Sequence, residues 1–285
     1  MTLRHLARSA VSSLSTKGAA ETARLARGYV GSRFFPVPSD ETVRRFRLGQ
    51  RLSRELDSTV AFGPFTGLRL DDSSWWGAAD RGSMLLGIYE KEVLDWVAAA
   101  CARRSTLVDL GAADGYYAVG CLAAGLVERA VTFEQSAEGQ AAIRVNARSN
   151  GVEGRVEVRG LAAADFAAEL VATSGVDFGD AVVIIDIEGA EFDVLSADCL
   201  RALAGAMVVV ELHEWVDGAS TALQRILADA ASAFDASYLV TGARDLSPFD
   251  MLRDWPDDDR WILCSESRQQ LMRWLVLTPR TQAVG

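Results

Sequence analysis

The sequence contains almost no lysine, few cysteines and no long apolar run. Lysine occurs only as Lys17 and Lys91, so arginine supplies nearly all of the positive charge, and the formal net charge is −10. An acidic chain is not expected to bind nucleic acid in general, because the phosphate backbone attracts basic surfaces. No apolar stretch approaches the roughly 20 residues that span a bilayer, and the N-terminus lacks the apolar core of a secretory signal. We therefore expect a cytoplasmic protein that is not transmembrane.

The cysteines are widely spaced and include no C-x-x-C pair. Such a pattern predicts buried small hydrophobic residues in a reducing compartment, not a disulfide framework. They are Cys101, Cys121, Cys199 and Cys264. With 285 residues, 49% of them hydrophobic, the chain can form one large domain with an extension, or two small domains.

The N-terminal region has the opposite charge from the rest of the chain. Residues 1–35 contain six basic side chains against one acid, Glu21. We interpret residues 1–57 as a helical basic extension. It could contact a membrane surface, a partner or a second copy of the chain as a homodimer. The alternative is a solvated extension that packs on the domain.

Residues 58–83 are expected to form a hairpin followed by a polar loop. The hairpin is indicated by apolar and small residues alternating around Gly63, Pro64 and Gly67. The loop carries Trp75 and Trp76, which could line a ligand cleft or pack the hairpin onto the core. The rest of the chain, residues 84–285, is expected to form the main domain.

Residues 105–120 organise this domain. Leu107–Leu110 form a short apolar run that is typical of a buried parallel strand. A turn of small residues follows, with Gly111 at its start and Gly115 at its end, and a helix begins near Tyr116. A strand, a small-residue turn and a helix bring backbone N–H groups close to a ligand. Asp109 lies inside the end of the strand, before Gly111, and is placed to meet a cationic or amine-bearing ligand.

After residue 105, strand and helix patterns alternate, which predicts a parallel sheet covered on its faces. Strands are expected near residues 106–110, 129–134, 154–158, 181–186, 206–212, 237–241 and 270–278. Helices are expected near residues 39–56, 87–100, 115–126, 137–149, 161–173, 190–203 and 217–234. A strand at 260–264 is left open, and the acidic stretch at 254–259 is expected to be a solvated loop.

The second strand of this pattern ends in Glu134. In a doubly wound sheet the carboxyl ends of the strands line the ligand crevice. Glu134 lies roughly 20 residues after the glycine turn, where an acid can accept hydrogen bonds from ribose hydroxyls. Gly160 and Leu161 follow the third strand, where an adenine could lie against backbone and apolar surface.

The fourth and fifth strands end in acids and one histidine. Asp186, Glu188 and Glu191 follow one strand, and Glu211 and His213 end the next. Adjacent strands lie roughly 4.8 Å apart, so Asp186, Glu211 and His213 could converge. A neutral imidazole there could remove a proton from a substrate hydroxyl, or the three residues could bind a metal.

Together these segments resemble FkbM-type methyltransferases, a branch of the class I fold that uses S-adenosyl-L-methionine (SAM). The resemblance covers roughly residues 84–240. The matching segments are Gly87 to Glu90, Asp109 to Tyr117, Phe133 to Glu134, Asn146 to Asn150, Asp186 to Glu191 and Glu211 to His213. The resemblance implies a Rossmann-like, doubly wound, seven-stranded and mostly parallel α/β sheet with helices on both faces.

The resemblance also implies how the cofactor would be held. Asp109, Gly111, Ala113 and Gly115 would hold the methionine part, and Glu134 would hold the ribose. Tyr89 and Glu90 would close over the cofactor. The full set of expected cofactor residues is Tyr89, Glu90, Asp109, Gly111, Ala113, Asp114, Gly115, Glu134, Gln135, Gly160, Leu161 and Asp186.

The predicted activity is O-methylation of a saccharide hydroxyl in a sugar, polysaccharide or glycolipid. Its expected catalytic residues are Asp186, Glu188, Glu191, Glu211 and His213. An alcohol ionises too weakly near neutral pH to attack unaided. The prediction therefore includes either His213 as a base or a Mg²⁺-like cation on Asp186, Glu211 and His213. Two alternatives remain: methylation of a polyketide or other small natural product, and a non-catalytic SAM-binding module.

Overall fold

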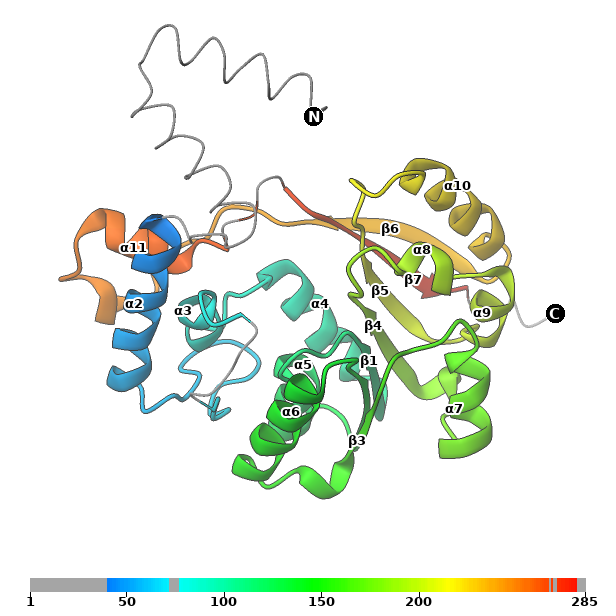
Figure 1. Cartoon of the computed structure of the whole chain (residues 1–285), viewed down its shortest axis with the longest axis horizontal. Helices are drawn as coiled ribbons and strands as arrows, with labels where there is room; N and C mark the ends of the chain where they lie inside the picture. Colours follow the sequence, from blue (N-terminus) through cyan, green and yellow to red (C-terminus); the bar gives the residue numbers. More distant parts are fainter. Residues whose placement is uncertain (1–39, 72–76, 267, 269–270, 281–285) are drawn as a thin grey trace, which may run out of the picture. The chain divides into compact units, whose positions relative to one another are not determined.

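The computed structural model describes residues 40–71, 77–266, 268 and 271–280 (Figure 1). Residues 44–285 form one compact unit, and of residues 1–43 only 40–43 are described, as the start of helix α2 (Asp40–Glu55). The predicted basic extension therefore falls largely outside the described residues, as do Trp75 and Trp76. The division of the chain at residues 57 and 83 stays a prediction.

A seven-stranded sheet forms the centre of the compact unit, in the order β3-β2-β1-β4-β5-β7-β6. Its strands are β1 (Thr106–Leu110), β2 (Arg129–Phe133), β3 (Val156–Arg159), β4 (Ala181–Ile185), β5 (Met207–Glu211), β6 (Phe234–Val240) and β7 (Arg273–Pro279). The first five strands pair in parallel, and β7 lies antiparallel between β5 and β6. The chain reverses its strand order beside β1 and β4, where open sheets of this kind bind ligands.

The central strands of the sheet are buried on both of their faces. Every residue of β1 and β4 is buried, and apolar side chains on alternate positions enter two different cores. Leu107 belongs to the core on one face, and Val108 and Leu110 belong to the core on the other. Asp109 is thus a buried carboxyl group between apolar neighbours on the strand, and burial disfavours its charged form.

Helices cover both faces of the sheet (Figure 1). The core on one face includes residues of α4 (Lys91–Cys101), α5 (Tyr116–Ala123) and α6 (Ala137–Ser149). The core on the other face includes residues of α7 (Phe166–Ser174), α8 (Glu191–Val194), α9 (Ala197–Ala202) and α10 (Ala219–Ala230). Two further helices, α3 (Arg81–Leu85) and α11 (Asp257–Cys264), pack against each other through Gly82 and Leu263. This architecture confirms the predicted doubly wound α/β fold.

Two local expectations were wrong, and the region 260–264, where a strand was left open, is the end of α11. Asp257–Asp259 open that helix instead of forming a loop. Acidic residues in a first turn are stabilised by the helix dipole, which explains the difference. The expected helix at 190–203 is divided into α8 and α9, because Ser196 caps a new start by accepting a hydrogen bond from the Cys199 N–H.

The hairpin expected near residues 58–70 is reduced to one antiparallel bridge, between Thr59 and Arg69. All four cysteines are buried and free, as expected. Within the described residues, no helix is both long enough and apolar enough to cross a membrane.

Candidate functional site

The turn after β1 passes so close to the end of β4 that its first position must be glycine. Gly111 has a φ of +84°, and a methyl group added there would lie 1.6 Å from the carbonyl oxygen of Asp186. The Gly111 and Ala112 N–H groups both donate to the Phe133 carbonyl, at 2.9 and 3.0 Å. The turn therefore joins the ends of β1, β2 and β4 at one edge of the sheet.

Glu134, directly after β2, is locked to this turn by backbone donors. Its Oε2 accepts a hydrogen bond from the Ala113 N–H at 3.0 Å, and its Oε1 accepts one from the Ser136 N–H at 2.8 Å. Ala113 adopts a left-handed φ of +50°, which is uncommon for a residue with a side chain. The carboxylate is thus fixed in position, and each oxygen keeps a lone pair for a ligand hydroxyl.

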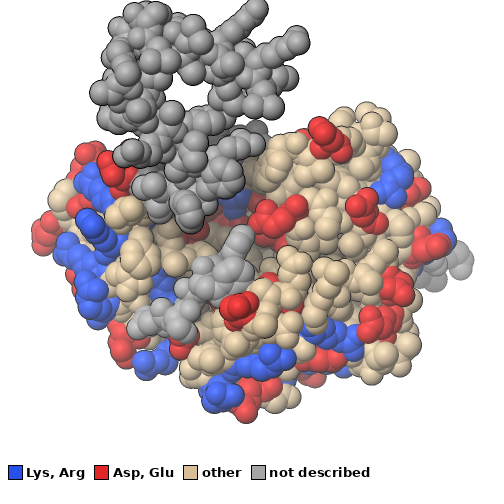
Figure 2. Space-filling model, viewed as in Figure 1, with Lys and Arg blue, Asp and Glu red and all other residues tan. Residues whose placement is uncertain are grey.

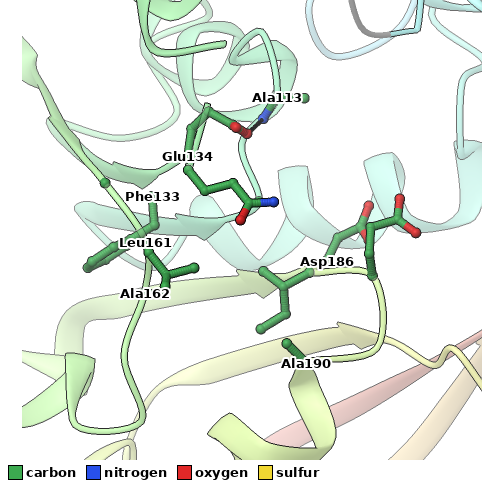
Figure 3. Close-up of a pocket in the computed structure, with 12 residues that line it drawn as sticks. Ala113, Phe133, Glu134, Leu161, Ala162, Asp186 and Ala190 are labelled. Atoms are coloured by element: carbon green, nitrogen blue, oxygen red, sulfur yellow. Dashed lines mark hydrogen bonds between the residues drawn. The ribbon is translucent and has the colours of Figure 1, made fainter. Parts of the chain in front are cut away.

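A cavity of about 190 Å³ opens beside Glu134. Figure 3 shows it between Leu161 and Ala162 on one side and Asp186 on the other. Leu161 is 76% exposed, which is unusual for a leucine and leaves an apolar surface at the cavity wall. Seven of the expected cofactor residues line the cavity: Gly111, Ala113, Glu134, Gln135, Gly160, Leu161 and Asp186.

A smaller cavity of about 40 Å³ lies on the other side of the turn. The expected cofactor residues that line it are Tyr89, Glu90, Asp109, Gly111, Ala113, Asp114 and Asp186. Three residues, Gly111, Ala113 and Asp186, line both cavities. Gly115 lines neither, and a side chain there would meet Val119 and Ile143. Its place is structural, at the left-handed start of α5.

Asp109 and Glu90 are buried carboxyl groups with raised proton affinity. Burial, followed by the charge of Glu134, raises the pKa of Asp109 to about 7. Burial, followed by the charge of Glu211, raises the pKa of Glu90 to about 8. Glu90 also has a left-handed φ of +45° and accepts a hydrogen bond from the Tyr117 hydroxyl at 2.8 Å. Strained backbone and raised pKa values of this kind gather at functional sites.

His213, beyond β5, is held by a fully buried carboxylate. Glu191 is 0% exposed. Its Oε1 lies 2.9 Å from His213 Nδ1 and accepts from the His213 backbone N–H at 3.0 Å. Its Oε2 accepts from the Gly189 N–H at 2.8 Å. A carboxylate beside Nδ1 favours the tautomer with the proton on that nitrogen, so the lone pair of the neutral ring is on Nε2.

The lone-pair nitrogen of His213 faces three further carboxyl groups. Nε2 lies 3.7 Å from Asp186 Oδ1, 3.5 Å from Glu188 Oε2 and 3.8 Å from Glu211 Oε2. Burial and the adjacent Glu211 hold the pKa of Asp186 well above its usual range. Oδ1 of Asp186 is buried and has no hydrogen-bond partner among the described residues. It is therefore free to accept a hydrogen bond from a ligand.

These charges also set the proton affinity of the imidazole. Burial lowers the pKa of His213, but the hydrogen bond and charge of Glu191, together with the charges of Glu211 and Glu188, raise it overall. Asp186, Glu211 and His213 offer ligand atoms within 4.8 Å of one another, so the three predicted metal ligands do converge. The site can thus either move a proton or hold a cation.

Two residues that the sequence pattern did not single out complete the site. Arg268 donates to Glu211 and Glu90, and Trp215 places its ring 4.9 Å from the His213 ring, edge to face, while remaining 57% exposed. Trp215 could have been noticed from its position two residues after His213. Arg268 lies 57 residues from Glu211 in the sequence, in a segment without a recognisable motif, and no sequence signal would have identified it.

Comparison with known proteins agrees with the geometry. The family model described as "Methyltransferase FkbM domain" matches residues 92–232. This range contains the glycine turn, Glu134, Glu191 and His213, but not Arg268. No curated protein sequence matches the chain.

Solved structures with a similar chain path include several from bacteria. An O-methyltransferase from Bacillus cereus, in complex with SAH, is 16% identical, with 89% of this chain and 97% of that chain covered and a TM-score of 0.46. Cofactor-bound Rv0187 from MTB is 17% identical, with coverage of 88% and 95% and a TM-score of 0.44. The C-terminal domain of precorrin-6Y C5,15-methyltransferase from Rhodobacter capsulatus is 20% identical, with coverage of 66% and 87% and a TM-score of 0.41. At these identities and TM-scores the neighbours carry no information on this chain's activity.

Proposed function

Because residues 92–232 belong to the FkbM methyltransferase family, we propose that the protein is a SAM-dependent O-methyltransferase that acts on a hydroxyl of a saccharide. One observation carries the proposal. The buried Glu191–His213 pair presents an imidazole lone pair at the same sheet edge as the glycine turn and Glu134. A proton acceptor and a nucleotide-type pocket are therefore adjacent.

Each of the two cavities would hold a different part of the cofactor. Glu134 would accept from the ribose hydroxyls, and Leu161 and Ala162 offer apolar surface for the adenine. Asp109 and Glu90, in the smaller cavity, would face the cationic methionine part, whose positive charge would favour their ionised forms. The bound cofactor supplies a methyl group already activated by its sulfonium. This chain's residues must therefore align the acceptor oxygen and remove its proton.

His213 is the base in this proposal, and Glu191 is its positioning residue. Glu191 holds the Nδ1–H and stabilises the imidazolium that forms when Nε2 takes the proton. The buried Asp186 Oδ1, without a partner among the described residues, would accept a hydrogen bond from the acceptor. Alternatively, Asp186, Glu211 and His213 would hold a divalent cation that lowers the pKa of the acceptor hydroxyl.

Two features of the site support a sugar as the acceptor, and the surface charge disfavours a nucleic acid. Asp186 and Glu188 offer several hydrogen-bond acceptors near Nε2, which suits a ligand with many hydroxyl groups. The exposed Trp215 ring beside His213 offers a flat surface on which the C–H face of a sugar ring can pack. On the face shown in Figure 2, acidic and basic side chains are intermixed, which is unlike a nucleic-acid-binding surface.

A SAH-release assay with a panel of monosaccharides, oligosaccharides, glycolipids and polyketide alcohols tests the proposal. We expect turnover with a saccharide, and a loss of roughly 10²–10⁴-fold in kcat for His213→Ala, the usual contribution of a general base. Turnover with only a polyketide alcohol would overturn the sugar assignment but not O-methylation. SAM binding with no turnover by any acceptor would favour the non-catalytic alternative.

The predicted location, homodimer and membrane contact remain predictions. The homodimer and the membrane contact concern the N-terminal extension, most of which is outside the described residues.

A further inference from the structure

An arginine from outside the family match lies among the carboxyl groups of the site. Arg268 belongs to the segment between α11 and β7. Its Nη1 donates to Glu211 Oε1 at 2.6 Å, its Nε donates to Glu266 Oε2 at 2.9 Å, and its Nη2 donates to Glu90 Oε1. The side chains of all three acids are at most 8% exposed, and that of Arg268 is 19% exposed.

Arg268 is held in place by a second ion pair. Glu266 Oε1 accepts a hydrogen bond from Arg244 Nη2 at 2.6 Å, and Arg244 Nη1 donates to Glu92 at 3.0 Å. The side chain of Arg244 is only 7% exposed. The guanidinium of Arg268 therefore belongs to a buried chain of alternating charges, which distinguishes it from a surface arginine that happens to reach an acid. Buried networks of this type lose much stability when one partner is removed.

The position of Arg268 matters for Glu211, one of the three candidate metal ligands. Among the described residues, Arg268 is the one arginine or lysine within ion-pair distance of Glu211 and Glu90. Glu211 Oε1 is taken by the guanidinium, and a dication on Oε2 would be separated from that guanidinium by a single carboxyl group. Like charges at such a separation repel strongly where water is excluded.

A metal would also occupy the atom that the proposed mechanism needs. Because Glu191 holds Nδ1 of His213, the only free lone pair of the ring is on Nε2. A cation bound by Asp186, Glu211 and His213 would use this lone pair, and none would remain to accept a proton. The residues thus suit either a base balanced by an arginine or a metal site without the arginine, but not both.

We propose that Arg268 supplies the positive charge that a divalent cation would otherwise bring to Glu211, and that the site therefore holds no metal. The exclusion of metal from the site does not depend on the proposed function. The conclusion that methyl transfer proceeds without metal does rest on the proposed function. Arg268 acts through Glu211 and is a positioning residue. The residues present therefore disagree with the metal-assisted alternative.

Titration of the full chain with Mn²⁺, followed by electron paramagnetic resonance, tests the exclusion without any acceptor. We expect wild type to show no Mn²⁺ bound at the site. Arg268→Met should bind Mn²⁺ at least about tenfold more tightly, the lower end of the range over which outer partners change metal affinity. Adding Glu211→Gln to Arg268→Met should remove that binding. Arg273→Met is the control, because Arg273 pairs with the partly exposed Glu214, which is not one of the three candidate metal ligands.

The proposal can be overturned even if Arg268→Met fails to fold. Submillimolar Mn²⁺ binding by wild type that disappears in Asp186→Asn would contradict it. So would a folded Arg268→Met variant that binds Mn²⁺ no better than wild type. Calorimetry of the same samples with SAH separates this result from the proposed function, because loss of SAH binding bears on the cofactor and not on Arg268.

Discussion

The two sides of the site are built in different ways. On the cofactor side, the turn from Gly111 to Ala113 and the Glu134 carboxylate are joined by backbone hydrogen bonds over short distances. On the acceptor side, Glu191, Glu211, His213 and Arg268 are charged or ionisable side chains from separate segments of the chain. Backbone geometry fixes the first side, and charge balance fixes the second.

This difference follows from what each side must do. A nucleotide is recognised by backbone N–H groups and a few fixed acceptors, which a tight turn provides once glycine permits it. Proton transfer needs a group whose pKa is tuned, and tuning requires buried charges that are paired with one another. The cofactor side should therefore be sensitive to shape, and the acceptor side to charge. Variants on each side of the site test that distinction.

Gly111→Ala should be the most damaging change on the cofactor side. The added methyl would lie 1.6 Å from the Asp186 carbonyl oxygen, which is backbone and cannot move away cheaply. Overpacking and the left-handed φ together should lower the free energy of unfolding by about 3 kcal/mol or more. Urea denaturation followed by circular dichroism measures the loss.

Gly125→Ala is the matched control for this variant. Gly125 also has a positive φ, +68°, but no atom lies within 4 Å of an added methyl. It should lose only the conformational cost, about 1–2 kcal/mol. Equal losses for the two variants would show that the approach of Gly111 to Asp186 is looser than described.

Glu191→Gln should act on the acceptor side through charge alone. The carboxylate holds Nδ1 of His213 and raises its pKa, so replacing it with the neutral amide should lower that pKa. Only His5 and His213 are present, so NMR titration in a His5→Ala background reports His213 without overlap. Its ¹⁵N shifts should also show the proton on Nδ1 in the neutral ring.

Other charged groups near His213 also affect its titration. Glu188, Glu211 and Asp186 face Nε2 and remain in the variant. Asp193→Asn, on the same short helix, controls for the loss of one negative charge. A pKa that does not change in Glu191→Gln would mean that Glu191 is not ionised beside the ring.

Asp109→Asn should have a smaller effect than Gly111→Ala, and the size of that effect depends on pH. The pKa of Asp109 is raised from about 3.9 in the unfolded chain to about 7 in the folded protein. The carboxyl therefore contributes stability that is fully present below pH 4 and is lost as the pH rises through 7. Asparagine does not titrate, so the stability of the variant relative to wild type should rise by about 2–3 kcal/mol between pH 5 and pH 8.

Thermal unfolding without cofactor at the two pH values measures this gain. Asp254→Asn, at an exposed position, controls for the removal of one negative charge from an acidic protein. The same Asp109→Asn variant should bind SAH more weakly. A variant that is equally destabilised at both pH values would show that Asp109 is ionised and paired in the folded protein.

The contrast between the two sides also explains how much the sequence could predict. Strand and turn patterns located Gly111, Asp109 and Glu134, because each function lies within one contiguous segment whose residues determine its backbone. The edge of the sheet then brought His213 and Asp186 together, as adjacent parallel strands require. The order of residues along the chain was sufficient for both.

Other features depend on contacts between distant segments and have no recognisable local sequence pattern. Arg268 reaches Glu90 across 178 positions, and its role exists only once β7 has entered the sheet beside β5. Glu191 opens α8, and only the folded chain shows that its buried carboxylate also contacts His213, 22 positions away. Charge pairing between distant elements cannot be derived from spacing or periodicity.

Calorimetric titration with SAH tests the assignment of this sheet edge as a methyltransferase cofactor site. We expect wild type to bind SAH. Glu134→Gln should bind it roughly 10–100-fold more weakly, because hydrogen bonds to a charged group contribute about 1.5–3 kcal/mol. Glu153→Gln, at an exposed position paired with Arg148, should bind like wild type. If folded wild type binds neither SAM nor SAH, the assignment of this sheet edge as a methyltransferase site is wrong.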